Sequence, residues 1–133
     1  FLNENCTDFA MARILLAEDD DNLRPFLARS LENAGHEVLA FSDGEDALPA
    51  LGAGQIDILI SDLVMPGMNG IELARHAREQ EPDLPVIFIT GFSAVAMEAL
   101  NTVDGVSKVL SKPFHLNSLV EAVHNALEDR AIS

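Results

Sequence analysis

The chain has 133 residues and a formal net charge of −14. Such an acidic surface repels the phosphates of nucleic acids and of anionic lipids, so we expect neither to be a partner. The 48% of hydrophobic and 23% of charged residues are typical of one globular domain rather than of a disordered chain.

Residues 1–10 show no hydrophobic periodicity, and Met11 follows them directly before an apolar run. We therefore expect 1–10 to be an N-terminal tail, disordered or vector-derived, and 11–133 to form one domain with no output domain after it. The tail holds the single cysteine, Cys6, so no internal disulfide can form, which favours a cytoplasmic location. No signal peptide is visible, and no apolar run approaches the roughly 20 residues of a membrane span.

Short apolar runs alternate along the chain with patterns of helical periodicity. In chain order, the sequence predicts a strand over 13–17, a helix over 22–33, a strand over 36–41, a helix opening at 42–45, a strand over 56–61, a loop over 65–70, a helix over 71–80, a strand over 85–90, a short helix over 93–101, a strand over 106–110 and a helix over 116–129. Gly35 is expected to end the first helix. Ser42 and Glu45 have the spacing of a capping box, and Pro49 is expected to kink or shorten the helix that follows.

Five strand–helix units predict an α/β, doubly wound fold, in which right-handed crossovers join parallel strands and helices cover both faces of the sheet. The predicted strands are almost wholly apolar, as expected for strands that are buried on both faces. In such folds the functional site lies at the carboxyl ends of the strands.

Polar side chains of different chemistry stand at the ends of four predicted strands. Glu18 and Asp19 follow the first strand, Asp62 follows the third, Thr90 ends the fourth and Lys112 follows the fifth. Carboxylates from two strands suit Mg²⁺, which keeps several waters and takes few protein ligands. A carboxylate beside the ion can act as a nucleophile toward phosphorus, while a hydroxyl and an ammonium group hold the phosphoryl oxygens. The pattern indicates Mg²⁺-assisted phosphoryl transfer to an aspartate.

Other acids and the histidines have simpler interpretations. Asp20 and Asp21 are expected to face solvent at the N-terminus of the first helix, where negative charge favours the helix dipole. The four histidines have no metal-ligand spacing among them, and we expect most of them at the surface.

Four segments, ILLAEDDDNLR, DLVMPGMNG, FITG and LSKPF, resemble in order and spacing the motif set of the response-regulator receiver domain, the CheY-like fold. The resemblance covers nearly all of 11–129. It implies a flavodoxin-like (βα)5 architecture with parallel strands in the order 2-1-3-4-5. It also implies a two-component phosphorelay in which a histidine kinase or a histidine phosphotransferase is the donor.

Carried over residue by residue, the resemblance implies a role for each polar group at the strand ends. Asp62 matches the phosphoacceptor, Thr90 matches the switch hydroxyl, and Lys112 matches the lysine that contacts the phosphoryl group. The implied Mg²⁺ ligands are Asp19 directly, Glu18 largely through water, Asp62, and the backbone carbonyl of Val64.

The residues that conduct the signal depart from the family pattern. Many receivers carry an aromatic residue three places before the lysine, but this chain has Val109 there and contains no tyrosine or tryptophan. The usual coupling of Thr90 to an inward-turning ring therefore cannot operate in that form. Phe92 is one candidate for the missing ring, and the alternative is that it packs in the core. The resemblance also implies a cis peptide bond before Pro113.

Within the family, DLVMPGMNGIELAR, FITGF and KVLSKPFHL are similar to the CpdR-type single-domain regulators of alphaproteobacteria. That likeness implies a role in cell-cycle proteolysis, in which the unphosphorylated regulator primes the ClpXP protease and ClpX is a partner. We expect signalling through contacts of the fourth helix, fifth strand and fifth helix. The chain is expected to act as a monomer or weak dimer, not as a turnover enzyme.

Several alternatives stay open. Within the receiver family, the chain could be a phosphorelay intermediate or another stand-alone regulator. A haloacid-dehalogenase-like phosphohydrolase would need a second aspartate two places after the first, where this chain has Val64. A flavodoxin-like cofactor binder would need a phosphate loop after the first strand, where four acids would repel a phosphate. An adaptor that no longer accepts phosphate would not need the complete set of polar groups.

Overall fold

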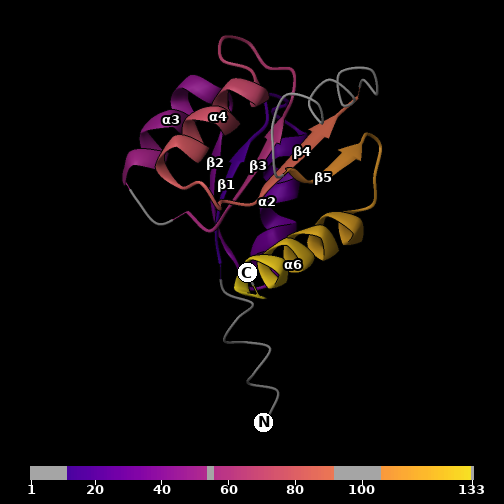
Figure 1. Cartoon of the computed structure of the whole chain (residues 1–133). Coiled ribbons are helices and arrows are strands. Elements are labelled where there is room, and N and C mark those ends of the chain that lie inside the picture. Colours follow the sequence, from indigo (N-terminus) through magenta and orange to yellow (C-terminus); the bar gives the residue numbers. More distant parts are fainter. Residues whose placement is uncertain (1–11, 54–55, 92–105, 133) are drawn as a thin grey trace.

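A computed structural model of the chain describes residues 12–53, 56–91 and 106–132 (Figure 1). The strands are β1 (Arg13–Ala17), β2 (Glu37–Phe41), β3 (Ile58–Asp62), β4 (Val86–Thr90) and β5 (Val106–Ser111). The helices are α2 (Leu23–Asn33), α3 (Gly44–Ala53), α4 (Gly70–Gln80) and α6 (Leu116–Ile132). The predicted tail 1–10, the predicted helix 93–101 and Phe92 lie outside the described residues.

The five strands form one sheet in the order β2-β1-β3-β4-β5, and every neighbouring pair is parallel. Parallel pairing carries the chain back across the sheet after each strand, so all carboxyl ends lie at one edge. The α/β class and the strand order are therefore confirmed.

Helices cover both faces of the sheet (Figure 1). Side chains of β1 alternate between the two faces: Leu15 belongs to the core beneath α3 and α4, and Ile14 to the core beneath α2 and α6. β3 and β4 divide their side chains in the same way, and every residue of both strands is buried. Strands enclosed on both sides must be apolar along their whole length, which explains the continuous hydrophobic runs.

The helix beginnings differ in detail from the predictions. The predicted capping residue Ser42 is wrong by one position, because α3 begins at Gly44 and Asp43 Oδ1 accepts the hydrogen bond from the Asp46 amide at 2.7 Å. Pro49 does not end α3, which continues to Ala53. A complete capping box stands instead at the start of α4, where Asn69 and Glu72 each accept a hydrogen bond from the other's amide.

The expectation of surface histidines does not hold for His36, which is buried just before β2. Its Nδ1 accepts a hydrogen bond from the Ala12 amide at 3.2 Å, so the ring proton of the neutral form must lie on Nε2. Nε2 lies 3.2 Å from Nε2 of His124 on α6. His36 therefore donates to His124, and this bond connects the start of β2 with the final helix.

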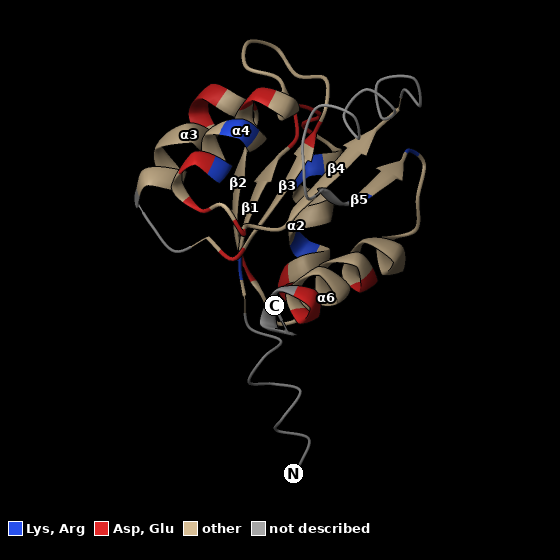
Figure 2. Ribbon diagram, in the orientation of Figure 1, with Lys and Arg blue, Asp and Glu red and all other residues tan. Residues whose placement is uncertain are grey.

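Acidic residues are spread over α3, α4, α6 and the strand ends, with few basic residues among them (Figure 2). None of the described helices is long and apolar enough to span a bilayer.

Candidate functional site

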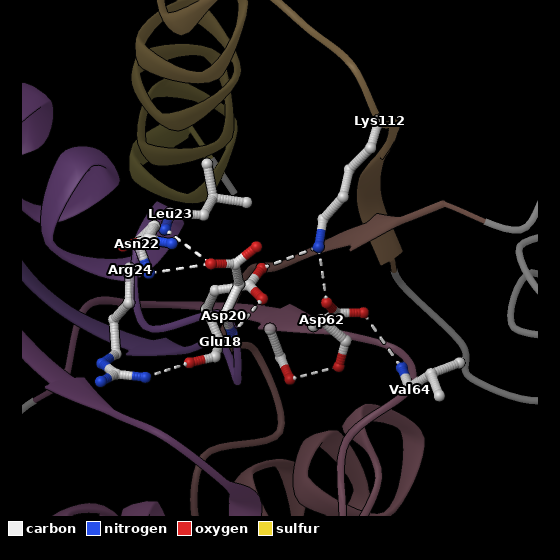
Figure 3. Close-up of polar contacts among 9 residues, drawn as sticks. Glu18, Asp20, Asn22, Leu23, Arg24, Asp62, Val64 and Lys112 are labelled. Carbon is white, nitrogen blue, oxygen red and sulfur yellow. Dashed lines mark hydrogen bonds and ion pairs between the residues drawn. The ribbon is translucent and has the colours of Figure 1, made fainter.

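The carboxyl edge of the sheet brings together most of the polar residues singled out in the sequence (Figure 3). Asp62 is the last residue of β3, so this strand runs one residue beyond the predicted end at 61. Glu18 directly follows β1, and Lys112 directly follows β5. The side chain of Lys112 reaches from β5 to both acids. Residues 94 positions apart thus meet because the parallel register aligns the strand ends.

Lys112 bridges the two buried carboxylates. Its Nζ donates a hydrogen bond to Asp62 Oδ2 at 2.8 Å and lies 3.1 Å from Glu18 Oε1. Burial alone would lower the pKa of Lys112, but the hydrogen bond to Asp62 and the charges of both acids raise it above its usual value. The ammonium group therefore stays charged and offsets the repulsion between the carboxylates.

Glu18 is fully buried, although it carries a carboxyl group. Its pKa is raised to about 7, by burial first and also by the charge of Asp62, while the hydrogen bond from the Asp20 amide and the nearby Lys112 act in the opposite direction. Oε2 accepts that amide hydrogen bond at 3.0 Å. Oε1 faces Lys112 but accepts no hydrogen bond of good geometry. A buried carboxylate oxygen that accepts no hydrogen bond favours a further cation beside it.

The acids of the edge have a donor set that fits a hard divalent cation. Oxygens of Glu18, Asp19 and Asp62 lie within 4.8 Å of one another. Asp19 is exposed, whereas the other two acids are buried, so an ion held here would keep waters on its outer side. Oxygen ligands from two chain segments and retained water match the preference of Mg²⁺.

The two carboxylate oxygens of Asp62 accept hydrogen bonds from different donors. Its Oδ1 accepts a hydrogen bond from the Val64 amide at 3.1 Å, while Oδ2 accepts from Lys112. The Val64 side chain is 47% exposed at the mouth of the site. The position two residues after Asp62 thus offers a backbone group and an apolar side chain, and no second carboxylate.

The remaining predicted residues lie near the site or behind it. Thr90 ends β4 fully buried, and its carbonyl accepts a hydrogen bond from the Lys112 amide at 2.7 Å. Val109 on β5 is partly buried and packs against the core beneath α3 and α4. The Lys112–Pro113 bond is cis, as expected. Phe92 is the one predicted site residue that lies outside the described residues.

The outer acids behave as expected for a helix N-terminus. Asp20 Oδ1 accepts hydrogen bonds from the amides of Asn22 at 2.8 Å and Leu23 at 3.0 Å. These bonds, the one from Leu23 first, lower the pKa of Asp20 below its usual value. Asp20 and Asp21 are both exposed, so neither joins the buried pair.

Sequence reasoning missed two residues that shape the site. Arg24 donates from Nη1 to the Glu18 carbonyl at 2.9 Å and from Nη2 to Asp21 Oδ1 at 2.7 Å. Gly70 begins α4 so close to β3 that a Cβ there would lie 2.2 Å from the Asp62 carbonyl oxygen. Arg24 carries a usable signal, because it is the only basic residue in the acidic segment 18–24. Gly70 gives no comparable signal, because its role depends on a contact between two elements.

Comparisons with known proteins agree with this architecture. The family model described as "Response regulator receiver domain" matches residues 14–124. The receiver protein CpdR of Brucella abortus is 50% identical over 117 residues, which cover 88% of this chain and 98% of that protein. The solved receiver domain of the hybrid histidine kinase CckA is 40% identical with a TM-score of 0.74, and the match covers 86% of this chain and 98% of that one.

A further solved structure is that of the response regulator TrrA of Thermotoga maritima, described as a complex with Mg²⁺–BeF. It is 31% identical with a TM-score of 0.78, and the match covers 88% of this chain and 100% of that one. These findings agree: the family model matches most of the chain, the match to CpdR covers that relative almost end to end, and the fold is shared with solved receiver domains. The chain belongs to the response-regulator receiver domain family.

Proposed function

We propose that this protein is a single-domain response regulator that accepts a phosphoryl group on Asp62 from a phosphohistidine of a histidine phosphotransferase or histidine kinase. One observation carries the proposal: the Asp62 carboxylate lies at the sheet edge, 2.8 Å from the Lys112 ammonium and among the oxygens of two further acids. This arrangement supports the proposal, because a carboxylate, a positive charge and a set of oxygens that fit a cation surround one point. The proposal places the chain in the cytoplasm with its donor.

In the proposed reaction, a carboxylate oxygen of Asp62 attacks the phosphorus of the phosphohistidine. The new O–P bond forms as the P–N bond breaks, and the bonding electrons leave with the imidazole nitrogen. Lys112 already contacts Asp62 Oδ2, so its ammonium group needs only a short movement to pair with an incoming phosphoryl oxygen. Thr90 would donate its hydroxyl to another phosphoryl oxygen.

Glu18, Asp19, Asp62 and the Val64 carbonyl would hold Mg²⁺. The bound ion would supply positive charge against the phosphoryl oxygens as they approach the carboxylates. The residues of the chain provide the rest: Asp62 is held between an amide and an ammonium group, and burial keeps bulk water from Glu18. The product would be an acyl phosphate, and we propose no turnover beyond its formation and hydrolysis.

The test is phosphotransfer from a purified, phosphorylated histidine phosphotransferase. The wild-type chain should take the label, and Asp62→Asn should leave it on the donor. Asp83→Asn is the matched control, because Asp83 is an exposed aspartate in the turn before β4. Labelling of Asp62→Asn at the wild-type rate would refute the assignment.

We further propose that the output is control of the ClpXP protease. The support is the 50% identity with a CpdR protein over 98% of its length. A groove between β5 and α6 belongs to the proposed output surface. Its lining includes Lys108, Glu121 and Asn125 and so offers both charge signs and an amide to a partner. Pull-down with ClpX should capture the unphosphorylated chain more strongly than the phosphorylated one, and equal capture of the two would count against this output.

A phosphorelay intermediate is the remaining alternative, and it makes a different prediction. An intermediate passes its phosphoryl group to a second histidine phosphotransferase faster than it loses the group to water. A terminal adaptor loses the group to water or back to its own donor. Following the label after addition of a second phosphotransferase separates the two.

A further inference from the structure

Arg24, in the first turn of α2, binds the acidic segment at three points. Its amide donates to the Asp20 carbonyl at 2.9 Å. Its guanidinium donates from Nη1 to the Glu18 carbonyl at 2.9 Å, a bond drawn in Figure 3. From Nη2 it donates to Asp21 Oδ1 at 2.7 Å. The Arg24 side chain is only 21% exposed, and its bond to the Glu18 carbonyl is partly buried, whereas its bond to Asp21 lies at the surface. One residue thus closes the segment 18–24 into a compact turn.

The closed turn fixes the backbone on both sides of Asp19. The peptide group before Asp19 contains the Glu18 carbonyl, which Arg24 Nη1 holds. The peptide group after Asp19 contains the Asp20 amide, which donates to Glu18 Oε2 at 3.0 Å. Asp19 itself is exposed and forms no bond of its own among the described hydrogen bonds and ion pairs. Its direction is therefore set by the two peptide groups that flank it, and one of these depends on Arg24.

We propose that Arg24 is a positioning residue for the divalent cation: it holds the Glu18–Asp19 peptide group so that the Asp19 carboxylate points toward Asp62. This inference rests on the cation site of the proposed function. A guanidinium can donate to a carbonyl and a carboxylate at once in a fixed plane, and an ammonium group on a flexible stem cannot reproduce that geometry. This pair of bonds from Nη1 and Nη2, the fork of Arg24, also screens the charge of Asp21 from the neighbouring acids.

Charge and positioning predict opposite effects on cation affinity. Arg24 is positive, so its charge alone repels a divalent cation, and removing that charge would tighten Mg²⁺ binding. If positioning dominates, loss of the fork frees Asp19 and weakens Mg²⁺ binding despite the lost repulsion. The sign of the change in dissociation constant therefore distinguishes the two roles. A residue that only stabilises the fold would change the melting temperature and leave the dissociation constant unaltered.

The experiment is a calorimetric Mg²⁺ titration of the full chain, with each variant held well below its own melting temperature. Arg24→Lys keeps the charge and loses the fork, and it should bind Mg²⁺ roughly tenfold more weakly, as is typical when a group that orients a metal ligand is lost. Arg24→Gln should also bind more weakly than wild type. Arg29→Lys is the matched control, because Arg29 is exposed on the same helix, and its affinity should not change.

Two results would overturn the proposal: an Arg24→Lys affinity within about twofold of wild type, where the expected loss is roughly tenfold, or an Arg24→Gln variant that binds Mg²⁺ more tightly than wild type. A second measurement does not depend on the metal. The amide resonances of Asp19 and Asp20 in metal-free protein should shift in Arg24→Lys and not in Arg29→Lys, and unchanged resonances would contradict the proposed turn.

Failure of this inference can be told apart from failure of the proposed function. If wild type binds no Mg²⁺, the cation site itself is wrong. If Asp19→Asn loses affinity and Arg24→Lys does not, only the role of Arg24 is wrong. In phosphotransfer, excess Mg²⁺ should restore the rate of Arg24→Lys but not that of Asp62→Asn. A rate that stays low at saturating Mg²⁺ would show that Arg24 acts otherwise than by positioning Asp19.

Discussion

Gly70 should be the least replaceable glycine of the site, because the start of α4 lies directly against the end of β3. A Cβ at position 70 would lie 2.2 Å from the Asp62 carbonyl oxygen, 2.9 Å from Ser61 Oγ and 3.1 Å from the Asp62 carbonyl carbon. Contacts of this length with backbone atoms cannot be relieved by turning a flexible side chain. In Gly70→Ala, either the first turn of α4 or the peptide group of Asp62 must move.

The expected cost follows from this overlap. Overpacking a buried site by one methyl group costs about 1–3 kcal/mol of unfolding free energy. For a domain of this size, each kcal/mol lowers the melting temperature by about 4 °C, so a fall of about 4–12 °C is expected. The displaced Asp62 backbone should also move the carboxylate from Lys112 and slow phosphoryl acceptance.

Gly52→Ala is the matched control. Gly52 lies in the last turn of α3, and a Cβ there would meet nothing within 4 Å. Alanine there is expected to leave stability unchanged or to raise it by at most about 0.5–1 kcal/mol, the gain at an interior helical position. Urea unfolding of both variants measures the contrast. The reasoning would be refuted if Gly70→Ala were as stable as wild type and accepted the phosphoryl group at the wild-type rate.

Three further predictions follow from particular contacts. Asn69→Ala removes the capping box of α4 and should cost about 1 kcal/mol in urea unfolding, and an unchanged midpoint would contradict this. Burial first, and then the charge of His124, hold the pKa of His36 below its usual 6.5. The unfolded chain therefore binds more protons below that pH, and stability should fall as the pH falls from about 7.5 to about 5.5, more in wild type than in His36→Gln. Equal losses in the two proteins would exclude this role of His36. Lys112→Ala leaves two carboxylates facing each other, so added Mg²⁺ should raise its melting temperature more than that of wild type. Thermal melts with and without Mg²⁺ measure this, and an equal rise in the two proteins would contradict it.

Hydrophobic periodicity was sufficient to predict the sheet and its polar edge. Each strand is a short apolar run because it is enclosed on both faces, and that constraint acts on every residue of the run. The position of Asp62 at a strand end follows from the same local pattern. Parallel pairing then puts all strand ends at one edge, and the strand order, which the family resemblance implied, brings Asp62 to Glu18 and Lys112.

The features that the sequence did not predict have a common physical cause. Each depends on a contact between elements or on a shift of a helix start by one residue. Ser42 and Asp43 are equally good capping residues, and the choice between them depends on where α3 packs on the sheet. The bond between His36 and His124 joins positions 88 residues apart, and no local pattern predicts it. The fork of Arg24 is likewise visible only once the turn after β1 is folded.

The central claim is that Asp62 is the acceptor at a Mg²⁺-dependent site. The most direct test is to incubate the chain with a phosphohistidine donor, with and without Mg²⁺, and to locate the modification by mass spectrometry. One phosphoryl group per chain is expected, on Asp62, formed only when Mg²⁺ is present. A phosphoryl group on any other residue, or equal labelling without Mg²⁺, would contradict it.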